Sequence, residues 1–402
     1  MQPPFGNIES NNMLIEVTGF CKLQCLYCYN SRFNKKKIIK DELSTKDIKR
    51  IILEAKELGY KNFIFSGGEP FLKEDFFSII KDCEDCNVAI FTSASISEKE
   101  WIANIAEYPQ IKKLRVSLDG LEINNSIRKG SDYKIIVENI LKIKQYGKIN
   151  IEINSMITSL NLLHLLEFYE FIKKIKPNRW NLDLPVFIGR ACKIENLEIM
   201  NIDFDQLGEI LTKLVKAYIK DLQPFRLSIR GIYDSSISYK KISFVEKRYG
   251  VPIAKILYPP NVHPCIYEQV TVIRPDGTIT RCPSHNKILA DIKEHLSLKE
   301  AIDTSNSDGF YKIKISQIKH CQNCRFINFC GAGCRANAKY LLGSDLKNDP
   351  IACNLVTIAE KFIWKLLPND QKRVYNSLVN EEGRMPVHNK NLLECIEHKN
   401  PI

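Results

Sequence analysis

Short apolar segments alternate with helical segments over the first half of the chain, and this alternation constrains the fold more than any other feature. Strands are predicted at residues 13–17, 62–65, 87–91, 113–117, 150–157 and 180–184, and helices at 45–58, 74–82, 97–107, 133–146 and 161–175. Ser44 stands where a helix cap is expected and Gly59 where that helix should stop. Six strand–helix units indicate a parallel α/β architecture, in which chemically active side chains follow the C-terminal ends of the strands.

Three cysteines, Cys21, Cys25 and Cys28, follow the first predicted strand with the spacing C-x3-C-x2-C. Three thiolates can bind three irons of a [4Fe-4S] cluster and leave the fourth iron without a protein ligand. An iron with an open site can bind and reduce a small molecule, whereas a fully ligated cluster only transfers electrons. A zinc site is the alternative, but zinc ribbons usually pair C-x2-C motifs or include histidine. The spacing therefore favours a catalytic iron–sulfur cluster.

A second motif, Gly67-Gly68-Glu69-Pro70, follows the strand predicted at 62–65. Two glycines allow the backbone to approach a ligand closely, and Glu69 can accept hydrogen bonds from an amino group. Taken alone, the motif could be an ordinary turn. Its position after the cysteine triplet favours a binding role.

Together these motifs resemble the radical S-adenosylmethionine (SAM) superfamily, and the resemblance covers roughly residues 10–200. It implies a partial (β/α)6 barrel, with Tyr27 near the adenine of SAM and the Gly-Gly-Glu-Pro segment at the SAM amino group. Ser117, Asp119 and Arg128 would lie near the ribose and carboxylate, because a guanidinium suits a carboxylate. A turn followed by a solvated arginine is the alternative for this last stretch. Asn154 and Asp183 are weaker candidates for lining the site.

The C-terminal third carries a second cysteine set. Between Cys265 and Cys282, residues 270–280 predict a β-hairpin with a Pro-Asp-Gly turn. The layout, Cys265, Cys282, Cys321-x2-Cys324-x5-Cys330-x3-Cys334 and Cys353, resembles the SPASM extension of radical SAM peptide-modifying enzymes. A double zinc site is the alternative.

The family pattern implies two auxiliary [4Fe-4S] clusters. Cys321, Cys324, Cys330 and Cys353 would ligate the outer cluster fully, and Cys265, Cys282 and Cys334 would hold the inner one. Many relatives place an eighth cysteine just before Cys265, and this chain has none there. The inner cluster would then keep an open iron, which could bind a substrate thiolate, or would recruit His263 or a remote group.

Four further cysteines, Cys83, Cys86, Cys192 and Cys395, are interpreted as structural, because free cysteine behaves as a small buried hydrophobe. Cys83 and Cys86 form a C-x2-C pair, which leaves open a redox role for that pair. Fourteen cysteines with no export signal indicate metal binding in a reducing compartment, so a cytoplasmic location is expected.

The net charge of +11 is interpreted as a lysine-rich solvated surface, with attraction to an acidic peptide or flavodoxin as the alternative. No aromatic–basic stripe suggests nucleic-acid binding, and no apolar run is long enough for a transmembrane helix. The expected domains are an N-terminal extension (1–11), a radical SAM core (12–200), a connecting region (201–260), a SPASM auxiliary-cluster domain (261–354) and a helical tail (355–402).

The predicted function is maturation of a ribosomally made peptide through a 5′-deoxyadenosyl radical, forming a thioether, carbon–carbon or carbon–oxygen cross-link. The expected partners are a peptide or protein substrate and a flavodoxin- or ferredoxin-type reductant. Leader recognition would need another surface or a separate protein, because only about twelve residues precede the first strand. No residue is identified as the general base.

Three alternatives stay open besides a zinc-binding interaction module. An anaerobic sulfatase-maturing enzyme would form formylglycine, but such enzymes place an aspartate where this chain has Pro283. A small-molecule dehydrogenase or epimerase is the second. The third is a non-catalytic iron–sulfur electron carrier, which would have no need of a SAM pocket.

Overall fold

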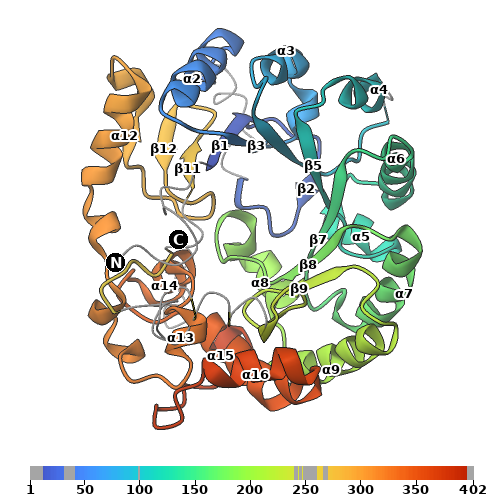
Figure 1. Ribbon diagram of the computed structural model, residues 1–402, viewed down its shortest axis with the longest axis vertical. Helices are drawn as coiled ribbons and strands as arrows, with labels where there is room; N and C mark the ends of the chain where they lie inside the picture. Colours follow the sequence, from blue (N-terminus) through green and yellow to red (C-terminus); the bar gives the residue numbers. More distant parts are fainter. Residues whose placement is uncertain are drawn as a thin grey trace. The chain divides into compact units, whose positions relative to one another are not determined.

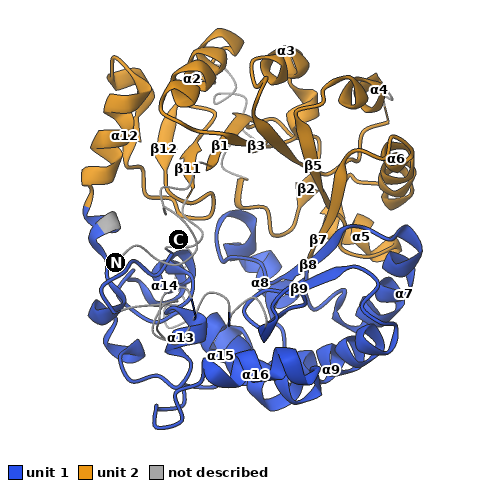
Figure 2. Ribbon diagram, viewed as in Figure 1, with its two compact units in different colours: residues 1–8, 156–268, 309–402 blue, residues 9–155, 269–308 orange. Residues whose placement is uncertain are grey.

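The computed structural model describes residues 12–30, 41–97, 100–239, 243, 247, 260–265 and 270–395. The chain forms two compact units (Figure 2). Unit 1 comprises residues 1–8, 156–268 and 309–402, and unit 2 comprises residues 9–155 and 269–308. The expected N-terminal extension lies outside the described residues. The predicted domain boundaries stay a prediction.

Unit 2 is built on a mainly parallel sheet with strand order β7-β5-β4-β3-β1-β11-β12-β13. The hairpin predicted at 270–280 is confirmed, and it extends this sheet because β11 pairs with β1 in parallel (Figure 1). The strands are β1 (Asn12–Thr18), β3 (Asn62–Gly67), β4 (Asn87–Thr92), β5 (Ile111–Ser117), β7 (Asn150–Met156), β11 (Thr271–Ile273), β12 (Thr278–Thr280) and β13 (Ala290–Asp291).

The helices of unit 2 lie outside its strands in Figure 1. They are α2 (Thr45–Glu57), α3 (Phe76–Lys81), α4 (Glu100–Glu107), α5 (Glu122–Ile127), α6 (Tyr133–Gln145) and α12 (Leu298–Ser307). Helix α2 begins at the predicted cap: the Ser44 hydroxyl accepts from the Asp47 amide, and the Asp47 carboxylate accepts from the Ser44 amide in a capping box. The helix stops at Gly59, whose φ of +90° suits glycine.

Unit 1 contains the parallel pair β8 (Arg179–Asp183) and β9 (Arg226–Ile229), with β10 (Tyr233–Asp234) antiparallel to β9. Trp180 on β8 is fully buried and meets Phe168 edge to face, with ring centroids 5.6 Å apart. The helices are α7 (Leu165–Ile175), α8 (Ile194–Met200), α9 (Phe204–Lys220), α13 (Ile327–Cys330), α14 (Arg335–Leu342), α15 (Pro350–Ile358) and α16 (Asn369–Ser377).

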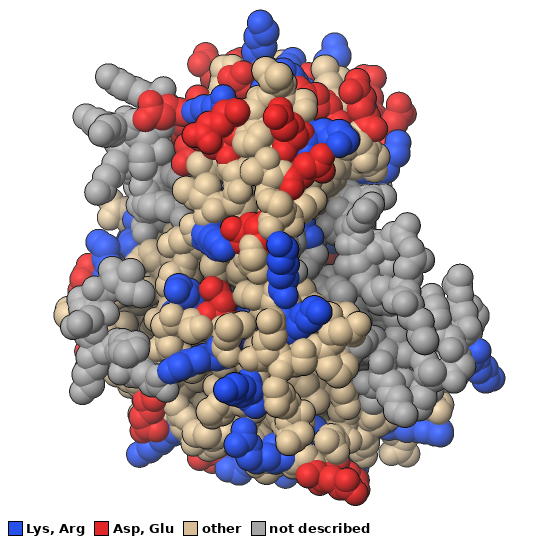
Figure 3. Space-filling model, turned by 90° about the vertical axis from the view of Figure 1, so that its left-hand side faces the viewer, with Lys and Arg blue, Asp and Glu red and all other residues tan. Residues whose placement is uncertain are grey.

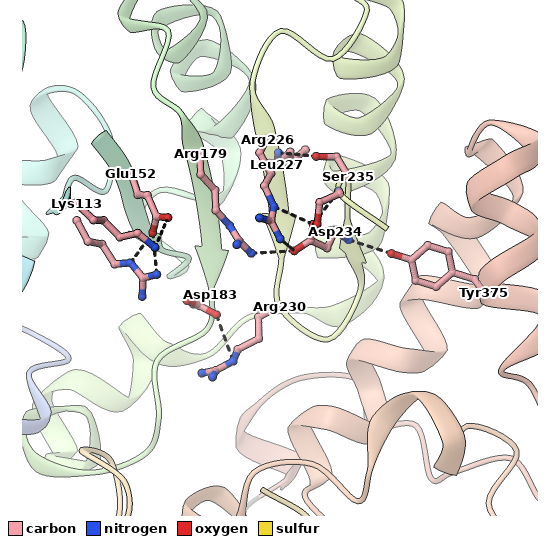
Figure 4. A network of polar contacts seen from close by, with 12 residues as sticks. Lys113, Glu152, Arg179, Asp183, Arg226, Leu227, Arg230, Asp234, Ser235 and Tyr375 are labelled. Atoms are coloured by element: carbon pink, nitrogen blue, oxygen red, sulfur yellow. Dashed lines mark hydrogen bonds and ion pairs between the residues drawn. The ribbon is translucent and has the colours of Figure 1, made fainter. Parts of the chain in front are cut away.

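Figure 4 shows polar side chains on the strands of both units. In unit 2, the Glu152 carboxylate on β7 pairs with Lys113 at 3.0 Å and Arg115 at 2.8 Å. In unit 1, Asp234 pairs with Arg179 at 2.8 Å. Because side chains alternate across a strand, Arg179 and Asp183 point away from the face on which Trp180 packs against α7.

The fold class agrees with the prediction. Parallel strands alternate with helices as in the partial (β/α)6 barrel, and a cysteine-rich region follows at the C-terminal side.

In the part of the chain that is described, no helix is long and apolar enough to cross a membrane. On the face drawn in Figure 3, most of the described acidic side chains lie in the upper part of the view, and basic side chains are more frequent in the lower part.

Candidate functional site

The three cysteines of the N-terminal set share one loop, which follows β1 in unit 2. The Cys28 amide donates to the Cys25 carbonyl at 3.2 Å, and the Leu23 amide donates to the Cys21 Sγ at 3.4 Å. Burial raises the pKa of the Cys21 thiol to about 12, and the nearby Cys25 and Cys28 contribute to the rise. Three neighbouring thiols on one short loop fit the donor set of an iron–sulfur cluster.

The Gly-Gly-Glu-Pro segment packs against the start of this loop. The Gly68 amide donates to the Thr18 carbonyl at 2.7 Å, and the Glu69 amide donates to the Phe20 carbonyl at 2.9 Å. A Cβ at Gly68 would lie 2.0 Å from the Phe20 oxygen, and one at Gly67 would lie 2.3 Å from the Thr18 oxygen. The two glycines therefore make room for the backbone of the cysteine loop, a requirement that the sequence alone does not reveal.

The Glu69 carboxylate is buried and held by the end of β4. It accepts from the Thr92 hydroxyl at 2.7 Å, the Ser93 amide at 2.8 Å and the Ser93 hydroxyl at 2.6 Å. Burial raises its pKa, and the bonds from Ser93 and Thr92 oppose the rise. These donors fix the orientation of Glu69 beside the cysteine loop.

A second buried network joins Tyr27, Asp119 and Arg128 to the same loop. The Tyr27 hydroxyl and the Arg128 Nε, the latter at 2.8 Å, both donate to the Asp119 Oδ2. The Arg128 Nη1 lies 3.8 Å from the Cys25 Sγ. A two-stranded ladder explains this placement, because β2 (Gln24–Cys25) pairs with β6 (Arg128–Lys129) and sets Cys25 opposite Arg128.

The structure thus brings Tyr27, Asp119 and Arg128, three of the predicted SAM-contact residues, together around Cys25. Ser117 ends β5 and is in register with Asn154, which lies two residues before the end of β7, so both lie toward the C-terminal ends of parallel strands. Pro70 opens a short 3-10 helix, Pro70–Leu72. The roles of these side chains toward SAM stay a prediction.

The four outer cysteines of the second set lie in unit 1. The Cys324 amide donates to the Cys321 carbonyl at 3.2 Å, and Cys353 lies on α15. Burial raises the pKa of the Cys330 thiol well above its ordinary value, with Cys353 and Cys321 contributing. Burial also raises the pKa of Cys353 to about 12. Cys321, Cys324 and Cys353 all contribute to the raised pKa of Cys330, so the four thiols lie near one another and fit a shared cluster.

The three inner cysteines are divided between the units: Cys265 and Cys334 belong to unit 1, and Cys282 belongs to unit 2. In unit 1, the Nδ1 of the His263 ring accepts from the Cys265 amide at 3.0 Å, and the Nε2 lies 3.0 Å from the Phe310 carbonyl. Both ring nitrogens are therefore engaged, which disfavours His263 as a cluster ligand.

Throughout the ranges that the structure describes, no three His, Cys, Asp or Glu side chains form a group that could hold a metal ion. The fit of both cysteine sets to clusters accordingly rests on the donor type and, for Cys21, Cys25 and Cys28, on one shared loop, not on a preformed cage. Cys83 and Cys86 are buried, and burial raises the pKa of each thiol, as expected for structural cysteines.

Glu16 on β1 and Arg274, the residue after β11, form a buried ion pair that was not predicted from the sequence. No motif marks either residue. The only available signal was a glutamate inside an otherwise apolar strand, Met13-Leu14-Ile15-Glu16-Val17.

Comparison with known proteins gives both a family and a fold. Residues 15–183 match the model of the radical SAM superfamily. The chain is 25% identical over 361 residues to the PqqA peptide cyclase of Bradyrhizobium diazoefficiens, covering 87% of each chain.

Two solved structures share the fold. The first is anSMEcpe with bound AdoMet, with a TM-score of 0.67 and 19% identity over 91% of this chain and 99% of that one. The second is Streptococcus suis SuiB bound to its precursor peptide SuiA, with a TM-score of 0.61 and 17% identity over 85% of this chain and 75% of SuiB. At these identities the likeness establishes the fold.

Proposed function

The chain belongs to the radical SAM superfamily, and we propose that it is a peptide maturase of that superfamily. As a radical SAM enzyme it uses a [4Fe-4S] cluster and SAM. The proposal names the substrate as a ribosomally made peptide and the product as a cross-linked side chain, such as a thioether or a carbon–carbon bond. Its location would be the cytoplasm, because fourteen cysteines suit a reducing compartment.

The observation that carries the proposal is the coexistence of two cysteine sets with different ligand counts. Three cysteines on the loop after β1 leave one iron open for SAM. Four neighbouring cysteines in unit 1 would ligate another cluster fully, and a fully ligated cluster suits electron transfer. A reaction that starts with hydrogen abstraction and ends in a new bond must release an electron, and such clusters can receive it. The likeness to a PqqA peptide cyclase and to SuiB, which binds a precursor peptide, supports a peptide substrate.

When bound, the cluster and SAM would supply the radical chemistry that removes a hydrogen atom from carbon. Cys21, Cys25 and Cys28 would hold the cluster. The Arg128 guanidinium donates toward the Cys25 sulfur and is fixed by Asp119, so it places positive charge beside the electron-accepting group.

Glu69 would accept from the SAM amino group, and the Gly67–Gly68 backbone would orient it. Ser117 would contribute to binding the ribose or carboxylate. The burial of Tyr27 and Glu69 would keep water from the reacting atoms.

The remaining cysteines would hold two auxiliary clusters. Cys321, Cys324, Cys330 and Cys353 would form the outer set. Cys265, Cys282 and Cys334 would form the inner set with one iron open, since His263 is engaged elsewhere. A substrate thiol could bind there, which favours thioether formation. A flavodoxin- or ferredoxin-type protein would supply the electron that starts each cycle.

Formylglycine formation is the second candidate, favoured by the shared fold with anSMEcpe and disfavoured by Pro283 in the position where sulfatase-maturing relatives carry aspartate. The Pro283 carbonyl accepts from the Arg274 Nη2 at 3.0 Å, so this residue helps to stabilise the loop. Its side chain cannot act as a base.

The test is the iron and sulfide content after anaerobic reconstitution, combined with an assay of SAM cleavage. The wild type should hold about twelve irons and a Cys21/Cys25/Cys28→Ala variant about eight, with 5′-deoxyadenosine formed only by the wild type. A Cys83/Cys86→Ala variant is the control and should keep about twelve irons. Zinc in place of iron, or no SAM cleavage with all clusters present, would exclude the enzyme and leave a binding protein or an electron carrier.

A further inference from the structure

We propose that Glu16 and Arg274 form a positioning link that ties the loop carrying Cys282 to the loop carrying Cys21, Cys25 and Cys28. Both loops and both linking residues belong to unit 2. The functional meaning rests on the proposed function, in which Cys282 is a ligand of an auxiliary cluster. The link itself stands on the contacts described below.

The register of the sheet creates the pair. Strand β1 pairs with β11 in parallel, with Met13 opposite Thr271, Leu14 opposite Val272 and Ile15 opposite Ile273. The next rung sets Glu16 beside Arg274. The Arg274 Nη1 lies 3.4 Å from the Glu16 Oε2, and each residue is 1% exposed. Figure 1 shows β1, β11 and β12 side by side.

On one side, Arg274 holds the loop that carries Cys282. Its Nη2 lies 3.5 Å from the Cys282 carbonyl, 3.0 Å from the Pro283 carbonyl and 3.2 Å from the His285 carbonyl. All three contacts are to Nη2, whose two N–H groups lie in the guanidinium plane, so this turn of the loop is held around one nitrogen atom.

On the other side, Glu16 holds the residues that directly follow Cys28. Its Oε1 accepts from the Asn30 Nδ2 at 3.2 Å, and the Tyr29 hydroxyl lies 3.5 Å from it. Asn30 also donates to the Gly67 carbonyl at 3.0 Å. One carboxylate thus connects the cysteine loop and the glycine motif to the guanidinium.

The two charges depend on each other. A buried arginine or glutamate is strongly disfavoured unless it is paired, and breaking such a pair leaves an uncompensated charge in a dry interior. Burial raises the pKa of Glu16, and Arg274 opposes the rise. Removing either partner should therefore release both loops, although these loops lie more than two hundred residues apart in the sequence.

For catalysis, the link would keep the distance between the two cysteine-bearing loops constant. Electron transfer between two redox centres falls steeply with distance, so a loop that drifts would slow the passage of the substrate electron. A link between the loops keeps Cys282 at a fixed place relative to the SAM-binding loop. Glu16 and Arg274 are in this sense positioning residues, which act through the cysteines and touch no reacting atom.

The test compares Glu16→Gln, which keeps the shape and removes the charge, with Arg274→Lys, which keeps the charge and removes the planar fork. Hydrogen exchange of the full-length apoprotein is followed by mass spectrometry. Each variant should accelerate exchange in segments 21–30 and 281–286 together by about tenfold or more, because each loses hydrogen bonds to a charged group. Gln110→Ala is the matched control: it removes a buried bond to the Ile80 carbonyl at 2.9 Å, at the start of β5.

The control should leave exchange in both segments as in the wild type. On reconstitution Arg274→Lys should also bind fewer irons than the wild type, because both cysteine-bearing loops are released. Acceleration confined to 21–30 in Glu16→Gln, or equal acceleration in Gln110→Ala, would overturn the link. The exchange in the two segments could be coupled in the apoprotein while the wild-type holoenzyme does not cleave SAM. That result would refute the proposed function and leave the link between the loops intact.

Discussion

Gly68 lies against the backbone of Phe20 in the cysteine loop. Gly68→Ala adds one methyl group there and tests whether this close approach requires glycine. The new Cβ would lie 2.0 Å from the Phe20 oxygen and 2.4 Å from the Phe20 carbonyl carbon. Roughly 1 Å or more of backbone movement is needed to reach ordinary contact distances. That movement stretches two hydrogen bonds, from the Gly68 amide to Thr18 at 2.7 Å and from the Glu69 amide to Phe20 at 2.9 Å.

The cost follows from these contacts. Overpacking costs about 1–3 kcal/mol, and each weakened hydrogen bond adds about 0.5–1.5 kcal/mol. Alanine also lowers the conformational entropy of the unfolded chain, which stabilises the folded variant by about 0.4–1 kcal/mol. The free energy of unfolding of the apoprotein should therefore fall by about 1–5 kcal/mol.

The assay is urea denaturation of the apoprotein followed by circular dichroism, together with iron content after reconstitution. Gly309→Ala is the control, because a Cβ there meets no atom within 4 Å and φ is not positive. It should be neutral or stabilising by about 0.4–1 kcal/mol. A Gly68→Ala variant within about 0.5 kcal/mol of the wild type, with full iron content, would refute the reasoning.

Three further changes have defined outcomes. Ser44→Ala removes the capping box of α2 and should lower the free energy of unfolding by about 1 kcal/mol, measured by thermal melting; an unchanged melting temperature would contradict the cap. Arg128→Gln removes the donor beside Cys25, so the SAM-binding cluster should become harder to reduce; an equal or higher potential in a redox titration would argue against that contact. Asp234→Asn tests pH dependence. Burial raises the pKa of this carboxyl, but bonds from Ser236 and the nearby arginines outweigh burial and lower it below 3.8. Its stabilisation should be complete above pH 3.8 and lost as the pH falls through the lowered pKa, so the gap between wild type and variant should be larger at about pH 6 than at about pH 3.

The regular elements of the core could be predicted because they depend on local patterns. Strand 111–117 and helix 133–145 lie within a few residues of their predicted ranges, since alternation and helical periodicity report burial directly. The elements that were not predicted include the helices α5, α8, α12 and α16 and the strands β9 and β10. Helix α16 (Asn369–Ser377) is mostly polar. Its buried residues include Val374 and Tyr375, which pack against residues far away in the sequence.

The candidate site divides in the same way. Spacing was enough to predict a site at Cys21, Cys25, Cys28 and the Gly-Gly-Glu-Pro segment, because one short loop keeps its own side chains together whatever surrounds it. The bond from Arg128 to Cys25 depends on a two-stranded ladder between segments about a hundred residues apart, and no local pattern encodes that pairing.

By itself, the sequence determined the α/β class, the two cysteine sets and the superfamily, because these follow from residue type, spacing and periodicity. Only the tertiary structure decided that the hairpin at 271–280 joins the core sheet beside β1, and that Glu16 and Arg274 meet there. It also decided that both nitrogens of His263 are engaged. The physical reason is that strand register and the pairing of buried charges depend on long-range contacts, which form only when the whole sheet is assembled.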